Sequence, residues 1–182
     1  MTATSWDQAA HAALVRIYEN VRKKPRASLE QLRTDLDDFI DELFHSSTGY
    51  DKAAIRWAVI GADALEVAIQ RDEPFDLIGV LQVLVRKQRD YGHENIRRFG
   101  RQGLMVRMHD KVARLENLLT SDGGGKPNNE SIKDNILDVV GYAAIGIMWE
   151  SQQFLLPLQN PPLHETMLRV IAHEHPTAPL SK

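Results

Sequence analysis

The chain contains no cysteine and no long apolar run, and both absences narrow what it can be. Without cysteine there is no disulfide framework, no thiolate zinc site and no cysteine nucleophile. The longest uncharged apolar stretch, Val139–Trp149, falls short of the roughly 20 residues that a membrane-spanning helix needs. Met1–Asp7 is polar and lacks the basic start and apolar run of a signal peptide. We therefore expect a cytoplasmic protein that contacts no membrane.

Charge of one sign is not in large excess, because the 182 residues carry a formal net charge of −3. This balance excludes a polycation that binds nucleic acid over its whole surface. The sequence also lacks a glycine-rich phosphate loop followed by Lys-Ser or Lys-Thr, and it lacks any clean alternation of apolar and polar residues. The length matches one domain. We therefore expect a single all-α domain over residues 1–182.

Apolar residues at helical spacing predict a bundle of about six to seven helices. Ser28, followed three residues later by Gln31, is typical of a capped helix start. Asp51 is expected to cap the next helix. Prolines, glycines and polar turns separate the segments. The predicted helices cover about residues 6–22, 29–44, 51–69, 76–89, 104–119, 129–154 and 163–173.

An acidic row in the second half of the chain is the first candidate site. Glu130, Asp134 and Asp138 are spaced four apart, so on one helix they would share a face beside the buried stripe. Like charges at this spacing destabilise a helix by about 0.2–0.5 kcal/mol per pair. A Mg²⁺ or Mn²⁺ ion would turn that repulsion into coordination, because hard cations prefer carboxylate oxygens. The alternative is a solvated acidic face near a helix start.

A second segment combines acidic and basic residues. Asp110 and Arg114 lie four apart, and Lys111 directly follows Asp110. As an ordinary surface ion pair, Asp110 and Arg114 would contribute about 0.3–0.5 kcal/mol. As a site, Asp110 would face the acidic row, with Lys111 and Arg114 binding phosphate.

A third cluster lies at the end of the predicted helix 76–89 and in the loop that follows it. It contains Lys87, Tyr91 and Asn95, followed by Arg97, Arg98 and Arg101. Tyr91 is a candidate for stacking on a base, Asn95 for contacting a sugar or base edge, and Lys87 for neutralising phosphate. The arginines also fit an ordinary exposed basic turn.

Together these segments resemble the phage-associated nucleotide-modification domain, which is similar to the MazG-like all-α nucleoside triphosphate pyrophosphohydrolases. The residues that carry the resemblance are Lys87, Asp90, Tyr91, Gly92 and Asn95, then Asp110, Lys111, Arg114 and Leu115, then Glu130, Ser131, Ile132, Asp134, Asp138, Gly141, Tyr142 and Ala143. It covers roughly residues 75–149. It implies a four-helix metal site, cleavage of a (d)NTP to (d)NMP and pyrophosphate, and a homodimer or homotetramer. Residues 1–74 would then complete the bundle, cover the base pocket or mediate assembly, and 175–182 would form a tail.

The chain departs from the ligand pattern of the better-known MazG-like enzymes. Those enzymes carry paired acidic residues three apart on each of two helices, whereas here Glu130 is four residues before Asp134, and Ala113 follows Asp110 at the three-residue spacing. Asp63 and Glu66 have the family spacing, but they lie in an otherwise apolar segment. They would either complete the site or form a narrow polar stripe that meets solvent.

These patterns lead to a specific prediction of function. We expect a Mg²⁺-dependent hydrolase of nucleoside triphosphates, in which Mn²⁺ can substitute. Asp110, Asp134 and Asp138, with Glu130, would bind the metal and activate water. Lys87, Tyr91, Asn95, Lys111 and Arg114 would bind the substrate. The alternative is a non-catalytic nucleotide- or DNA-binding helical protein linked to DNA base modification.

Overall fold

The computed structural model describes residues 3–23, 27–45, 49–120 and 131–174, and within them it contains eight helices and no strand. The prediction of an all-α fold is confirmed. No helix in these ranges is long and apolar enough to cross a membrane. The helices are α1 (Trp6–Val21), α2 (Leu29–His45), α3 (Tyr50–Gln70), α4 (Leu77–Tyr91), α5 (Glu94–Arg97), α6 (Gly100–Thr120), α7 (Ile132–Glu150) and α8 (Leu163–Glu174).

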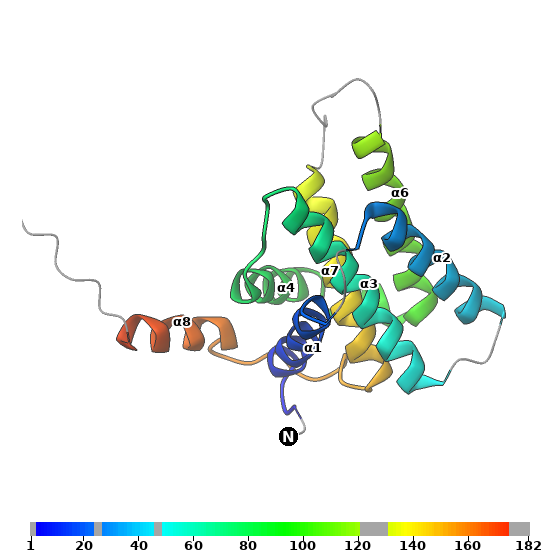
Figure 1. Cartoon of the computed structure of the whole chain (residues 1–182). Helices are drawn as coiled ribbons and strands as arrows, with labels where there is room; N and C mark the ends of the chain where they lie inside the picture. The colour runs from blue at the N-terminus through cyan, green and yellow to red at the C-terminus, as the bar shows by residue number, and fades with distance from the viewer. Residues whose placement is uncertain (1–2, 24–26, 46–48, 121–130, 175–182) are drawn as a thin grey trace, which may run out of the picture.

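Two helices, α3 and α7, form the centre of the bundle. They pack more extensively on each other than any other pair, α6 packs on α7, and α1 and α2 pack on α3. The α4 helix contacts α1 and α7, and α8 projects sideways from the bundle with few contacts (Figure 1). Both central helices are apolar on most of their surface, as helices surrounded by others must be.

Glycine allows the two central helices to approach closely. A Cβ atom added at Gly146 of α7 would lie 2.3 Å from the indole ring of Trp57 on α3. Trp57 is fully buried and packs edge-on against Phe39, with ring centroids 4.9 Å apart. Its Nε1 donates to Glu150 Oε1 at 3.2 Å. Burial raises the pKa of the Glu150 carboxyl, while the hydrogen bond from Trp57 and the charge of Arg101 oppose that shift.

The helix starts follow side-chain capping, with one correction to the prediction. The Ser28 hydroxyl accepts a hydrogen bond from the backbone N–H of Gln31 at 3.1 Å, as expected for the cap of α2. Asp51, in contrast, is not the cap of α3. The N-cap is Gly49, which forms no side-chain cap hydrogen bond. Because α3 begins at Tyr50, Asp51 lies in its first turn. Its negative charge interacts favourably there with the positive end of the helix dipole.

The boundaries around the predicted site also differ from expectation. The short helix α5 lies in the segment expected to be a loop, and α6 begins at Gly100, four residues before the predicted start at Leu104. The α7 helix begins at Ile132, after its N-cap Ser131, and ends at Glu150. The sequence predicted residues 129–154 for this helix. The later start places Asp134 in the first turn of α7, three residues after the N-cap.

Candidate functional site

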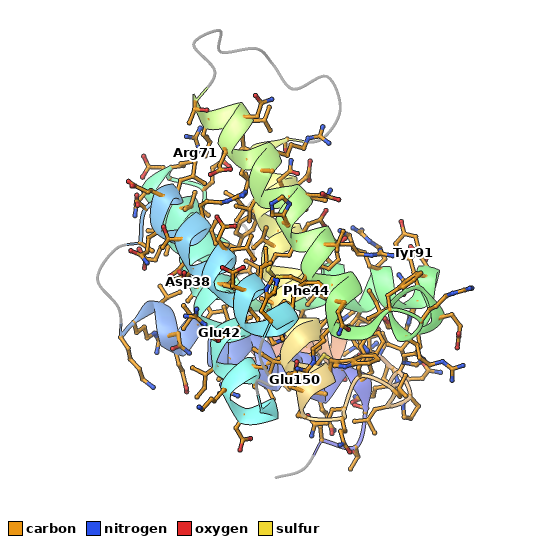
Figure 2. The ribbon with its side chains drawn as sticks, turned by 90° about the vertical axis from the view of Figure 1, so that its right-hand side faces the viewer. Asp38, Glu42, Phe44, Arg71, Tyr91 and Glu150 are labelled. Atoms are coloured by element: carbon orange, nitrogen blue, oxygen red, sulfur yellow. The ribbon has the colours of Figure 1, made fainter. Side chains whose placement is uncertain are left out.

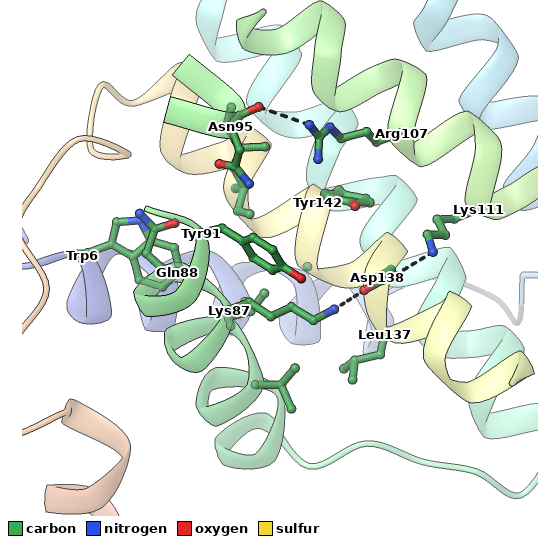
Figure 3. A pocket seen from close by; sticks show the side chains of 15 residues that line it. Trp6, Lys87, Gln88, Tyr91, Asn95, Arg107, Lys111, Leu137, Asp138 and Tyr142 are labelled. Atoms are coloured by element: carbon green, nitrogen blue, oxygen red, sulfur yellow. Dashed lines mark hydrogen bonds and ion pairs between the residues drawn. The ribbon is translucent and has the colours of Figure 1, made fainter. Parts of the chain in front are cut away.

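A pocket of about 510 Å³ opens between α4, α6 and α7, with walls completed by α1 and α5 (Figure 3). Its lining combines cationic, aromatic, amide and apolar side chains, with a single carboxylate. The residues that line it are Trp6, Val83, Leu84, Lys87, Gln88, Tyr91, Asn95, Ile96, Arg107, Lys111, Leu137, Asp138, Gly141, Tyr142 and Ile145.

Asp138 of α7 lies between two lysines from different helices. Lys111 of α6 approaches Asp138 Oδ2 to 3.0 Å, and Lys87 of α4 donates to Asp138 Oδ1 (Figure 3). The Asp138 and Lys111 side chains are only 14% and 17% exposed. Pairing of this kind offsets part of the cost of burying charge. The carboxylate therefore links the three helices that form the pocket.

Cations outnumber anions in the lining. Among the described lining residues, Lys87, Arg107 and Lys111 accompany one carboxylate, Asp138, which gives these four side chains a formal charge of +2. Arg107 Nη2 donates to the backbone carbonyl of Asn95 at 3.2 Å, which fixes the guanidinium against α5. A concave site with excess positive charge attracts anions.

Aromatic rings and amides line the rest of the pocket. Tyr91 is the last residue of α4 and is 67% exposed, and it lies at the outer edge of the molecule (Figure 2). Tyr142 and the fully buried Trp6 line the same pocket, as do the amides of Gln88 and Asn95. Such rings stack on planar ligands, and amides hydrogen-bond polar ligand edges.

Five of the residues singled out from the sequence therefore lie in one place: Lys87, Tyr91, Asn95, Lys111 and Asp138. These five residues are spread over positions 87 to 138 of the sequence, and the fold brings them together. Arg114 differs, because it lies on α6 but does not line the pocket. The role of these residues in binding substrate stays a prediction.

Two members of the acidic row, Asp134 and Asp138, lie four residues apart on α7, and Asp134 also has a local role at the start of the helix. Asp134 occupies the third position of α7 in a capping box: Ser131 Oγ accepts from the Asp134 backbone N–H at 3.0 Å, and the Ser131 backbone N–H donates to Asp134 Oδ2 at 3.1 Å. The hydrogen bond that the Ser131 hydroxyl donates to Asp134 Oδ2, together with the one from the Ser131 backbone N–H, lowers the pKa of the Asp134 carboxyl. Of the row's described members, Asp134 and Asp138 are both on α7. Glu130 lies outside the described residues.

The described carboxylates do not fit a divalent cation. Within the ranges that the structure describes, no group of three or more His, Asp or Glu side chains is placed to hold a metal ion. Both oxygens of Asp138 face ammonium groups, and one oxygen of Asp134 is taken by the helix cap. Asp110 is exposed on α6. The metal set of Asp110, Glu130, Asp134 and Asp138 thus stays a prediction.

Asp63 and Glu66 do not form a stripe that meets solvent. Asp63 is fully buried and Glu66 is 8% exposed, both on the central helix α3. Neither residue lines the pocket. The expectation of a solvated stripe is wrong because α3 is covered by α7, α1 and α2.

Four polar or aromatic pocket residues have no binding role assigned from the sequence: Trp6, Gln88, Arg107 and Tyr142, of which Tyr142 is named only among the residues that carry the resemblance. Local spacing could have found three of them. Arg107 is one helical turn before Lys111, Tyr142 is one turn after Asp138, and Gln88 is three residues before Tyr91. Trp6 carries no such signal, because it reaches the pocket only through the packing of α1.

No protein-family model, curated protein or solved structure matches the chain. The described part of the chain is a helical bundle with a pocket that is lined by cationic and aromatic side chains. The function has to be argued from the chemistry of that pocket.

Proposed function

We propose that the pocket binds a nucleoside triphosphate and that the protein hydrolyses it to a nucleoside monophosphate and pyrophosphate. The observation that carries the proposal is the meeting of Lys87, Lys111 and Arg107 with Tyr91 and Asn95 in one pocket of about 510 Å³. Nucleotides combine a polyanion with a flat aromatic base. The pocket offers a counterpart to each.

In this proposal, Lys87 and Lys111 bind the phosphate groups. Lys87 and Lys111 both contact the Asp138 carboxylate and line the pocket, so their ammonium groups lie side by side where a phosphate group would enter. Arg107 adds planar N–H donors, which suit phosphate oxygens. Tyr91, at the exposed end of α4, is placed to stack on the base.

Asp138 is the candidate general base. Once phosphate oxygens take up the two ammonium groups, its carboxylate can accept a proton from the attacking water. The water oxygen then bonds to the α-phosphorus, the bond from that phosphorus to the bridging oxygen breaks, and pyrophosphate leaves. Lys87 and Lys111 neutralise the charge that develops on the leaving group.

The resemblance also implies Mg²⁺, with Mn²⁺ as a substitute, and a homodimer or homotetramer. Because the described carboxylates do not assemble a metal site, no step of this mechanism passes through a resident ion. Measuring turnover with Mg²⁺, with Mn²⁺ and with chelator determines whether the metal is required. Light scattering of the purified chain gives the subunit count.

The test is release of pyrophosphate from a panel of dNTPs by the whole chain. We expect turnover by the native protein and at least a tenfold fall in Lys111→Met. Lys52→Met, a change of an exposed lysine on α3, is the matched control and should turn over normally. Absence of pyrophosphate release from every dNTP, with Mg²⁺ present, would contradict the hydrolase.

One observation favours a second candidate, a nucleotide- or DNA-binding protein without catalysis. It is the lack of a three-carboxylate group in the part of the chain that the structure describes. This candidate predicts saturable dNTP binding without pyrophosphate release. DNA binding with a steep salt dependence and no effect of nucleotide would instead indicate a nucleic-acid partner.

A further inference from the structure

Three polar atoms in the pocket wall have no hydrogen-bond partner among the described residues. They are Trp6 Nε1, Gln88 Nε2 and Asn95 Oδ1. Gln88 is only 6% exposed and Trp6 is fully buried. Buried polar groups are nearly always paired in folded proteins, and the exceptions mark places where water, an ion or a ligand binds.

These atoms lie apart from the two lysines. Figure 3 shows Trp6 and Gln88 on one side of the Tyr91 ring, and the row formed by Lys87, Asp138 and Lys111 on the other. The helical spacing of α4 explains this arrangement, because Tyr91 is three residues from Gln88 and four from Lys87. The pocket thus has a charged part around Asp138 and a neutral polar part, which Arg107 borders at the backbone carbonyl of Asn95.

The polarity of the unpaired atoms excludes a ligand made of phosphate alone. Trp6 Nε1 can only donate a hydrogen bond, whereas Asn95 Oδ1 can only accept one. A fully ionised phosphate chain has acceptors but no donor. The neutral part therefore needs a ligand group that carries donors and acceptors side by side.

We propose that Trp6, Gln88 and Asn95 bind the hydrogen-bonding edge of a nucleobase whose face rests on Tyr91. Gln88 and Asn95 are then specificity-determining residues. Trp6 supplies a fixed donor from α1, and the contact of Arg107 with the Asn95 carbonyl, at 3.2 Å, holds Asn95 in place. This inference rests on the proposed nucleotide function and adds to it the site that distinguishes one base from another.

The test measures dissociation constants for dATP, dGTP, dCTP, dTTP and dUTP, with inorganic tripolyphosphate as a base-free probe. The variants are Gln88→Leu and Asn95→Leu, which keep side-chain bulk but remove the amide. Gln82→Leu and Gln102→Leu, at exposed positions on α4 and α6, are the matched controls. Calorimetry gives the constants, and circular dichroism verifies folding.

In the native chain we expect one or more bases to bind at least tenfold more tightly than the others. Gln88→Leu and Asn95→Leu should reduce that preference to threefold or less and leave the affinity for tripolyphosphate within twofold. The control variants should keep the native preference. Gln88→Glu, which keeps the shape but replaces the N–H donor with an acceptor, should change the order of preference even if a leucine variant folds poorly.

Two results would overturn the inference while leaving the nucleotide function standing. These are a native chain without base preference, or a preference that is unchanged in both amide variants. If the native chain binds neither nucleotides nor tripolyphosphate, the proposed function itself fails, and the inference fails with it.

Discussion

Lys111 Nζ lies 3.0 Å from Oδ2 of Asp138, and this ion pair joins α6 to α7 at the wall of the pocket. Both side chains are largely buried. A pair in this environment is sensitive to loss of either partner, because the remaining charge would be left without compensation. The same pair also controls how much positive charge an incoming anion meets.

Asp138→Asn separates binding from turnover. Asp138 is the one carboxylate among the described lining residues, and its removal makes the formal charge there more positive. The affinity for a triphosphate should therefore rise about fivefold or more, which corresponds to the roughly 1 kcal/mol between two unit charges 4 Å apart in water. Turnover should be lost with the general base. Calorimetry and pyrophosphate release measure the two effects. Weaker triphosphate binding in a folded Asp138→Asn variant would show that the carboxylate does not oppose the anion.

Arg107→Gln should weaken binding of triphosphate about tenfold, since a hydrogen bond to a charged group contributes about 1.5–3 kcal/mol. It should also release Asn95, whose backbone carbonyl accepts from Arg107. Arg86→Gln, at an exposed position on α4, is the matched control. An affinity that is equal in both variants would remove Arg107 from the site.

The capping box of α7 predicts an effect on stability that depends on pH. Ser131→Ala should lower the free energy of unfolding by about 0.5–2 kcal/mol at neutral pH. Because the hydrogen bond from the Ser131 hydroxyl lowers the pKa of the Asp134 carboxyl in the folded state, the carboxylate's share of this stabilisation is present above the carboxyl's ordinary pKa and lost as pH falls through the folded value. The bond from the Asp134 backbone N–H to Ser131 Oγ does not depend on ionisation. Urea unfolding from pH 2 to pH 7 should therefore show the difference between the two proteins narrowing in acid. Parallel curves would contradict the linkage.

Gly146→Ala should destabilise the bundle by about 1–3 kcal/mol, because the new Cβ would lie 2.3 Å from the Trp57 ring. The ring cannot shift easily, since it packs on Phe39 and donates to Glu150. Gly49→Ala is the control, because nothing lies within 4 Å of its added Cβ. Thermal unfolding compares them, and equal midpoints would show that the α3–α7 contact is adaptable.

The all-helical class was predictable because apolar residues recur at helical spacing through most of the chain. Individual helix ends were less predictable. Ser28 was identified correctly as a cap. Ser131 was not, although Asp134 three residues later is the signature of a capping box. The sequence interpretation assigned Asp134 to a metal site and did not consider that its side chain could cap the start of α7, as it does in the structure.

The clustering of several candidate residues was also predictable in part. Lys87, Tyr91, Asn95 and Lys111 stand in segments whose composition indicates anion and ring binding, and the structure gathers them around Asp138. The burial of Asp63 and the arrival of Trp6 depend on which helices pack together. The spacing of residues along one helix does not reveal which helices pack together, so it predicts neither the burial of Asp63 nor the position of Trp6.

Trp6 has a consequence for any attempt to isolate the pocket. Its side chain is fully buried and lines the pocket, while the backbone N–H of the same residue donates to the Pro157 carbonyl at 2.8 Å. A truncated fragment spanning only residues 75–149 would therefore lose one wall of the cavity together with part of the core. The shape of the cavity therefore depends on the folding of segments at both ends of the polypeptide.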